Sequence, residues 1–253
     1  MGVLIHRRVG KYRLSAVRGA SVLTVESVTG DRADASKRAQ VVRLRREFGF
    51  PVPGPGWDDE DDEGLVLLAS AGGLPVATMR VTRHRPGTGE HPYMTPELDA
   101  LLPPVPDGIG LPDGIGLIGR LLVVPTHRIL YLPGLVAYAG VTWSAACWPL
   151  HYLACVTAPN FPGARRLMDT VLAQADVPLA GHDRPGRFMV TSVDDMQQHL
   201  RRCLARRGWR LAPGGTGAAA VAGEEGAGGR TPFDAAPVQV GGASTHVETG
   251  GVR

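Results

Sequence analysis

The sequence predicts a mixed α/β sheet with a disordered C-terminal tail, and three observations support this. Residues 114–157 have the pattern of an apolar strand, a sharp turn, a long apolar helix and a second strand. Residues 65–82 have the pattern of a tight hairpin. Residues 212–253 are rich in Gly and Ala, with few large apolar side chains and no periodicity. Such a segment cannot bury enough surface to offset its ordering entropy.

The central stretch indicates where a site should lie. A first strand over 117–124 ends near Pro125, which cannot donate to a sheet ladder. A turn follows over 126–134. The helix over 135–147 is too continuously apolar for a surface helix, so we expect it to pack broadly on the sheet, and the second strand covers 151–157. A helix N-terminus presents unpaired N–H groups that hold anions, so we expect the site beside the turn.

The remaining elements are assigned from alternation, caps and turn residues. In chain order they are a basic arm or strand over 1–20, a strand over 21–28, a helix capped by Asp34 or Ser36 and ending at Phe48, strands over 65–69 and 74–82, a helix over 163–175, a strand over 187–192, a helix over 194–207 capped by Asp194, and a short strand over 209–211. The Pro- and Gly-rich segment 83–116 is typical of a lid or substrate loop. We therefore expect a basic N-terminal arm at 1–20, one domain at 21–211 and a tail at 212–253.

Charge and cysteine content indicate which partners, metal sites and cellular locations to expect. Residues 1–46 carry eleven Lys or Arg against three acids, and 58–63 are six consecutive acids. The basic region can face nucleic acid, a membrane surface or an acidic protein, or be a solvated helix face. We expect no nucleic-acid partner, because the region lacks interleaved aromatics. The three cysteines have no metal-ligand spacing, so we expect reduced thiols and no metal site. No apolar run suits a membrane span or signal peptide, and a cytoplasmic location is expected.

Several short motifs occur in a fixed order. They are Arg38 with Phe48-Gly49-Phe50, an Asp-x-x-Asp pair formed by Asp58 or Asp59 with Asp61 or Asp62, Arg80 at the end of 76–80, and Arg120 at the end of 117–120. Over about residues 21–175 this order resembles the GNAT acyltransferase superfamily. The closer match is its branch of acyl-homoserine-lactone synthases, which are autoinducer synthases, and long-chain N-acyl amino acid synthases. The resemblance implies a mostly antiparallel GNAT-like sheet with helices on both faces.

The chain departs from the family pattern at two places. Leu117 stands where the family has a glutamate, so the role of that glutamate cannot be carried over. The phosphate loop of coenzyme A-dependent members is degenerate here, because Tyr131 and Pro133 would obstruct the approach of a pyrophosphate to the backbone. The synthase branch has a similarly degenerate loop and takes its acyl group from an acyl carrier protein, so the second departure favours a carrier-protein donor. The two departures together also support a catalytically silent module. Carrier proteins are acidic, and the basic side chains that could meet one are Arg38, Arg43, Arg45 and Arg46, or Arg165 and Arg166.

The resemblance implies a set of site residues. The catalytic candidates are Asp59, Asp62, Arg80 and Arg120. The substrate-binding candidates are Arg38, Phe50, Trp57, Leu121, Val123 and Trp143, with backbone N–H groups of 121–123 as oxyanion donors. The donor-phosphate candidates are His127, Arg128 and Gly134. Each has a structural alternative: the acids can be a solvated loop, the arginines can be salt-bridge partners, and the tryptophans can be core residues.

The predicted function is N-acyl transfer from a thioester donor, acyl carrier protein or acyl-CoA, to an amine or amino acid. The donor is a cosubstrate, and no tightly bound cofactor is expected. His127 is a possible base. Cys155 with His151 on one strand allows a covalent acyl-cysteine, although a buried apolar cysteine fits as well. The alternatives are a coenzyme A-dependent small-molecule acetyltransferase and a catalytically silent GNAT-like module that binds an acidic protein.

Overall fold

The structure is a computed structural model that describes residues 12–28, 35–48, 56–85, 94–103, 114–157, 164–178 and 183–213. The elements in these ranges are β1 (Arg13–Arg18), β2 (Ser21–Val28), α1 (Ala35–Phe48), α2 (Asp59–Glu63), β3 (Leu65–Ala71), β4 (Leu74–His84), α3 (Pro96–Asp99), β5 (Ile115–Val123), η2 (Pro125–Leu130), α4 (Leu132–Cys147), β6 (Tyr152–Thr157), η3 (Ala164–Leu167), β7 (Ala173–Val177), β8 (Gly186–Ser192), α5 (Val193–Arg206) and β9 (Arg210–Pro213). Phe50, most of the predicted lid and the tail from residue 214 lie outside the described residues.

The described strands form one nine-stranded sheet in the order β7-β8-β6-β5-β4-β3-β2-β1-β9. Strands β5 and β6 are parallel, and the other neighbours are antiparallel. Strand β5 is connected to β6 through α4, the crossover that a parallel pair needs. The predicted mixed, mostly antiparallel sheet is confirmed.

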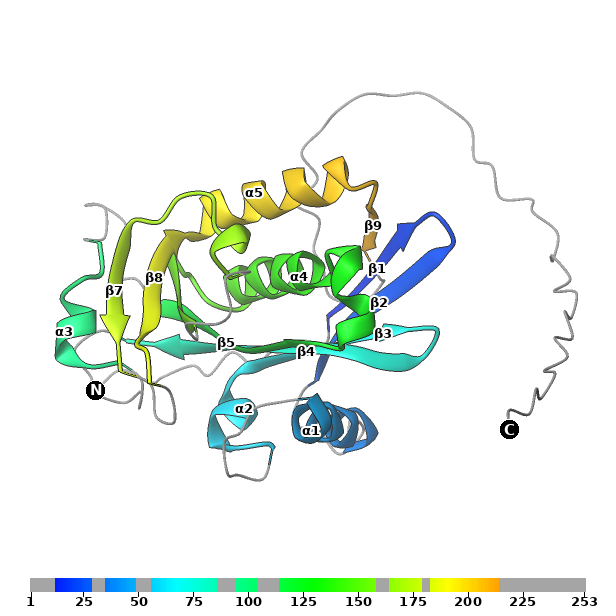
Figure 1. Cartoon of the computed structure of the whole chain (residues 1–253), viewed down its shortest axis with the longest axis horizontal. Coiled ribbons are helices and arrows are strands. Elements are labelled where there is room, and N and C mark those ends of the chain that lie inside the picture. The colour runs from blue at the N-terminus through cyan, green and yellow to red at the C-terminus, as the bar shows by residue number, and fades with distance from the viewer. Residues whose placement is uncertain are drawn as a thin grey trace, which may run out of the picture. The chain divides into compact units, whose positions relative to one another are not determined.

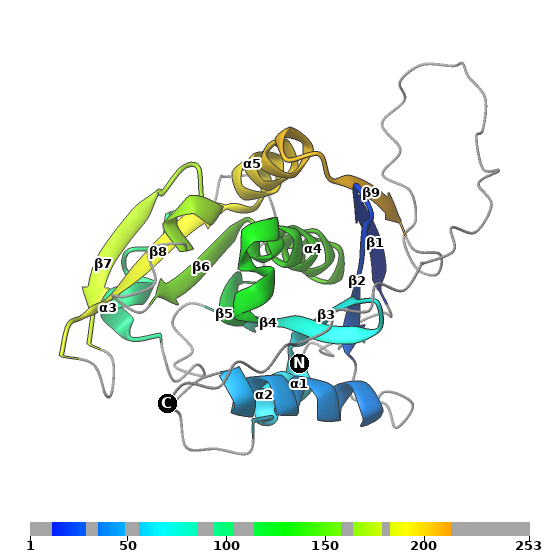
Figure 2. The ribbon, with the colours of Figure 1, turned by 45° about the vertical axis from the view of Figure 1, so that its right-hand side comes forward.

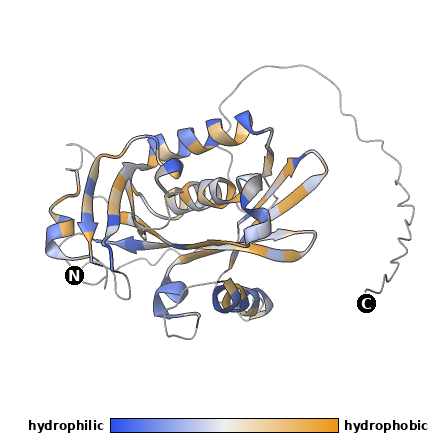
Figure 3. Cartoon of the chain, in the orientation of Figure 1, coloured by the Kyte–Doolittle hydropathy of each residue, from blue (hydrophilic) through white to orange (hydrophobic). Residues whose placement is uncertain are grey.

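Helices cover both faces of the sheet (Figures 1 and 2). On one face α4 is buried between the strands and α5, and residues such as Leu135, Val136 and Val141 are fully enclosed. On the other face Val41 and Leu44 of α1 pack in a smaller cluster that includes Val66, Leu68 and Leu122. Figure 3 shows hydrophilic and hydrophobic residues mixed along α1 and α5, as expected for helices with one solvated side. The broad burial predicted for α4 is confirmed.

Two local predictions differ from the structure, and one alternative that the sequence left open is resolved. The helix expected over 163–175 is wrong, since only the single turn η3 forms and Ala173–Val177 is the strand β7. Strand β7 exchanges backbone hydrogen bonds with β8, and this pairing overrides the local helix propensity of alanine and glutamine. Asp194 does not cap α5, because the Ser192 hydroxyl accepts the Asp195 N–H at 3.0 Å. Residues 13–18 of the basic N-terminal segment form β1, which is paired on both sides.

Gly114 sets the entry into β5, the strand that carries much of the candidate site. Its φ of +120° lies in a region that residues with a side chain rarely adopt, and a Cβ there would collide with the carbonyl oxygen of His84. Gly119, further along β5, has neither constraint. A glycine is therefore needed at the first position and not at the second.

We expect Gly114→Ala to lower the free energy of unfolding by about 2–4 kcal/mol, from the disfavoured φ and the backbone collision. Gly119→Ala is the matched control and should cause no comparable loss. Chemical denaturation followed by circular dichroism measures both. Equal stability of the two variants would contradict the described entry into β5.

Candidate functional site

The acidic run 58–63 folds as the short helix α2, and the spacing of two of its acids explains why. Asp58 is the N-cap, and its Oδ1 accepts the Asp61 N–H at 3.1 Å. The Asp61 Oδ2 accepts the Asp58 N–H at 3.0 Å in return. This reciprocal capping requires acceptors three residues apart. The sequence left open which acids form the Asp-x-x-Asp pair, and in the structure Asp58 and Asp61 do.

Asp61 forms a buried ion pair with Arg45 of α1. The Arg45 Nη1 and Nη2 atoms donate to the two carboxylate oxygens at 2.7 and 3.0 Å, and both side chains are almost inaccessible. Burial lowers the pKa of Arg45. Burial alone would raise the pKa of Asp61, but the hydrogen bonds and charge of Arg45 outweigh it and hold that pKa below its usual range. Arg45 is thus committed to the interior and is not part of a surface that could meet a partner.

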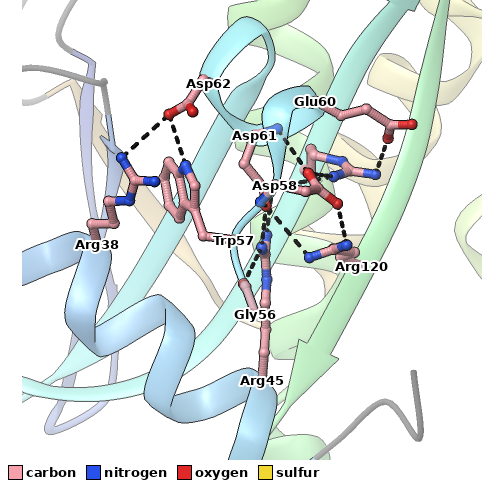
Figure 4. A network of polar contacts seen from close by, with 10 residues as sticks. Arg38, Arg45, Gly56, Trp57, Asp58, Glu60, Asp61, Asp62 and Arg120 are labelled. Carbon is pink, nitrogen blue, oxygen red and sulfur yellow. Dashed lines mark hydrogen bonds and ion pairs between the residues drawn. The ribbon is translucent and has the colours of Figure 1, made fainter. Parts of the chain in front are cut away.

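Two further arginines reach the same helix from neighbouring strands, and one of them, Arg120, is labelled in Figure 4. Arg80 of β4 donates to Asp58 Oδ1 at 2.7 Å and also pairs with Glu60. Arg120 of β5 pairs with Asp58 and approaches Asp61 Oδ2 at 3.4 Å. These arginines, both catalytic candidates from the sequence, are therefore salt-bridge partners of the acids.

Glu60 is a member of this cluster that the sequence reasoning missed. It lies between the two capping aspartates in the sequence, and its carboxylate faces Arg80. Burial raises the pKa of Glu60 above its usual range, against the opposing charge of Arg80. The predicted Asp59 is instead exposed on the first turn of α2, and no hydrogen bond or ion pair found among the described residues joins it to the arginines.

Three predicted site residues contact one another beside the cluster. The Trp57 Nε1 donates to Asp62 Oδ1 at 2.8 Å, and Arg38 donates to the same oxygen at 3.3 Å. The Arg38 guanidinium also lies 4.5 Å above the Trp57 ring, a cation–π contact. Trp57 is buried in the core under α1. The group anchors α2 to α1, which is a structural role for all three residues.

The strand β5 has a bulge at Arg120. Gly119 pairs with Arg80 and Leu122 pairs with Thr78, so Arg120 and Leu121 together oppose the single residue Met79. Arg120 has a φ of +51°, as expected where an extra residue is inserted into a strand. The bulge brings the Arg120 side chain to the acids of α2.

The edge of β5 beyond this bulge is open. In the described residues the pairing of β5 with β6 covers only Gly116–Ile118 and Leu153–Cys155, so the two strands separate after Ile118. The Val124 N–H donates to Val76 of β4, whereas the Val123 carbonyl accepts from Arg128 Nε at 3.2 Å. Neighbouring peptide groups of a strand point to opposite sides, so the Val123 N–H points away from β4 toward the opening. By the same period of two residues, so does the Leu121 N–H.

The N-terminus of α4 lies just after this opening, but its backbone donors are largely used. The Gly134 and Leu135 N–H groups donate to the Tyr131 carbonyl at 3.1 and 3.3 Å, and Pro133 has no N–H. The Tyr131 ring lies directly against Gly134. Gly134 is therefore poorly placed as a phosphate donor, while Arg128 is exposed and His127 is half-buried with its Nδ1 2.9 Å from Thr126.

The other candidates lie elsewhere. Trp143 stacks on Tyr12 in the core around α4, whereas Trp57 belongs to the cluster under α1. Burial raises the pKa of the Cys155 thiol to about 12, which suits the buried-cysteine alternative better than a covalent acyl-cysteine. Leu117 is buried in a third apolar cluster.

The described residues hold no group of three or more His, Cys, Asp or Glu side chains arranged for a metal ion. None of the helices in these ranges is both long enough and apolar enough to cross a membrane.

Comparison with known proteins finds similarity in solved structures. No protein-family model matches the sequence, and no curated protein sequence matches it. Similar structures include FeeM, an N-acyl amino acid synthase from uncultured soil microbes, with 12% identity, a TM-score of 0.49 and coverage of 71% of this chain and 96% of FeeM. A GNAT-family acetyltransferase from Streptococcus pneumoniae has 13% identity, a TM-score of 0.44 and coverage of 67% and 98%. The CoA-dependent acyl-homoserine lactone synthase MesI has 18% identity, a TM-score of 0.44 and coverage of 69% and 89%.

Among these neighbours the Streptococcus pneumoniae protein is described as a member of the GNAT family, FeeM as an N-acyl amino acid synthase and MesI as an acyl-homoserine lactone synthase. At such identities and TM-scores the comparison concerns the fold. The activity has to be argued from the site itself.

The buried Arg45–Asp61 pair gives a stability prediction. Asp61→Asn should cost about 3–5 kcal/mol, because it leaves the Arg45 charge buried and incompletely paired. The folded-state pKa of Asp61 is depressed, so its contribution is present above the unfolded value of about 4 and is lost as the pH falls through the folded value. The free energy of unfolding of the variant should therefore fall less steeply than that of the wild type as the pH is lowered. Denaturant unfolding at several pH values measures both effects.

Asp59→Asn is the control for that prediction, because Asp59 is exposed on the same helix and its replacement should change stability by about 0.5 kcal/mol or less. A double variant, Arg45→Met with Asp61→Leu, should recover much of the loss, since no unpaired charge remains buried. Equal stability of Asp61→Asn and Asp59→Asn would contradict the ion pair.

Proposed function

We propose that this protein is an N-acyltransferase that moves an acyl group from a thioester donor to the amine of a small molecule such as an amino acid. The observation that carries the proposal is the bulge at Arg120. It brings the carboxylate–arginine cluster to one side of β5, and among the described residues no strand pairs with the next part of β5 on the side of β6. Acyl transfer needs both features close together.

The open edge suits the electrophile. A thioester carbonyl placed against β5 would receive a hydrogen bond from either the Leu121 or the Val123 N–H group, and this bond strengthens as the oxygen gains charge. The position of these groups is fixed by the pairing of β5 with β4, so little reorganisation is needed when charge develops.

The cluster suits the amine. An amine must lose its proton before or during attack, and Glu60 is the carboxylate of the cluster whose pKa is raised by burial. The Glu60 side chain is 24% exposed to solvent, so a substrate can approach it. We assign Glu60 as the proton acceptor, directly or through water, and Arg80 and Arg120 as the residues that position it and Asp58. In this assignment Glu60 supplies a carboxylate that the chain lacks at Leu117.

The donor is proposed to be a carrier protein rather than free coenzyme A. A pyrophosphate needs several free backbone N–H groups at the helix terminus, and here Gly134 and Leu135 already donate to Tyr131. A phosphopantetheine arm on a carrier protein brings a single phosphate, which Arg128 is exposed enough to meet.

A basic surface for an acidic donor protein is present on α1. Arg38, Arg43 and Arg46 line a hollow along the outer side of this helix, together with Ala35, Ala39, Val42 and Glu47. Such a surface speeds the encounter with an acidic protein, and the effect falls with salt. The sequence analysis also included Arg45 in this basic surface. Arg45 is paired with Asp61 in the interior, so the proposed surface consists of the other three arginines.

Thiol release tests the proposal. Purified protein is mixed with acyl-carrier-protein or acyl-CoA donors of several chain lengths and with a panel of amines and amino acids. We expect release that needs both donor and amine, that is faster with the carrier protein, and that declines with salt. Faster release from short acyl-CoA would instead favour the small-molecule acetyltransferase.

An Arg43→Ala, Arg46→Ala double variant should raise the KM for the carrier-protein donor with little change in kcat, because these exposed side chains are assigned only to docking. If no donor gives thiol release and the protein binds a carrier protein or another acidic protein tightly, the proposal of an enzyme is wrong. That result would favour the catalytically silent module.

The neighbouring pair Glu60 and Asp59 tests the base. Glu60→Gln should lower kcat by about 10²-fold or more, whereas Asp59→Asn should leave it nearly unchanged. Because the Glu60 pKa is raised, wild-type activity should fall as the pH drops through a value above that of an ordinary glutamate, and this limb should be missing in Glu60→Gln. Rates of Glu60→Gln and Asp59→Asn that are indistinguishable would remove Glu60 from the mechanism.

A further inference from the structure

The three cysteines have different surroundings. Cys147 is buried and its thiol donates to the Tyr12 hydroxyl at 3.3 Å. Cys155 is buried among apolar residues, and burial raises its pKa to about 12. Cys203 lies on α5 and is partly exposed. Only Cys203 combines access with polar neighbours that can take part in thiol chemistry.

The Cys203 sulfur is surrounded by a histidine and an arginine from its own helix. The His199 Nε2 lies 3.6 Å from the sulfur, and the Arg206 Nη2 donates to it at 3.3 Å. A cysteine reacts as the thiolate, so a reaction needs a group that takes the proton and donors that hold the negative charge. His199 and Arg206 occupy those two positions.

A carboxylate outside α5 orients the histidine. The His199 Nδ1 lies 3.4 Å from Asp169 Oδ1, while Nε2 lies 3.1 Å from the Arg166 carbonyl oxygen. Both partners are acceptors, so they orient the ring and leave Nε2 beside the Cys203 sulfur. The arrangement thus has the order thiol, imidazole, carboxylate that activates nucleophilic cysteines.

We propose that Cys203 is a nucleophilic thiol, activated by His199 and Asp169, that forms mixed disulfides with small disulfide compounds. His199 holds the thiol proton and the Cys203 sulfur attacks one sulfur of the disulfide. A new S–S bond forms as that of the reagent breaks, the leaving group departs as a thiolate, and His199 then releases the thiol proton to solvent. The exchange conserves electrons, so no separate oxidant is required.

The modification would occur next to Tyr131. Burial, and after it the neighbouring Cys203 thiol, raise the pKa of Tyr131 to about 12. The ring of Tyr131 lies against Gly134 on one side and carries the Arg207 guanidinium 4.4 Å from its centre. A group attached to Cys203 would therefore press on the residue that covers the start of α4.

The rate of reaction with an aromatic disulfide that releases a coloured thiolate tests the proposal on the native full-length protein. We expect one thiol per chain to react fast, and all three to react after denaturation. Cys203→Ser should remove the fast reaction, while Cys147→Ser should keep it. Asp169→Asn, which alters an exposed residue and should not disturb folding, and His199→Ala should slow it by roughly tenfold or more.

Arg206→Ala and Arg201→Ala form a matched pair, because both remove an exposed arginine from α5 and only Arg206 donates to the sulfur. The first should slow the reaction and the second should not. A fast reaction that survives in Cys203→Ser, or equal rates in wild type and both His199→Ala and Asp169→Asn, would overturn the proposal. The assay contains no acyl donor or amine, so its outcome is independent of the proposed acyl transfer.

Discussion

The buried ion pair between Arg45 and Asp61 is the constraint on which the site depends. A charge removed from water must be paired, and this pair fixes the distance between α1 and α2. Helix α2 has only five residues and six acids stand in a row, so it would not be stable alone. Arginines from α1, β4 and β5 hold it against the sheet. The acidic run is thus part of the folded structure rather than a solvated loop.

The bulge at Arg120 connects this network to the open edge of β5. One extra residue in the strand sends a guanidinium toward α2 and leaves the following N–H groups on the side where β5 and β6 separate. In a regular strand, side chains and N–H groups alternate strictly from one side to the other. Without the bulge, the residue that reaches the acids of α2 and the residues with outward N–H groups would not follow one another directly in β5. The same local distortion therefore serves both the electrophile and the amine in the proposed reaction.

Tyr131 covers the N-terminus of α4. Tyr131 uses its carbonyl to accept two helix N–H groups and its ring to cover Gly134, while Arg207 lies over the ring. Because these N–H groups already donate to Tyr131, the helix terminus has fewer donors available to bind an anion than the helix dipole alone suggests. In the proposed reaction, donor binding would then rely on side chains such as Arg128 and on protein contacts. The partly exposed Cys203 contributes to the raised pKa of the same tyrosine, so the proposed thiol exchange and the proposed donor binding would both occur near Tyr131.

Local pattern was enough to predict the central hairpin and the strands and helix of residues 114–157, because alternation, apolar runs and turn residues act over short distances. The candidates Arg80 and Arg120 came from the resemblance to the acyltransferase superfamily. Local pattern did not predict that Ala173–Val177 is a strand, since that depends on pairing with β8. Sequence also left the choice among six adjacent acids open. Only the tertiary structure decided that Asp58, Glu60 and Asp61 face the arginines and Asp59 faces solvent, because those arginines come from elements far apart in the chain.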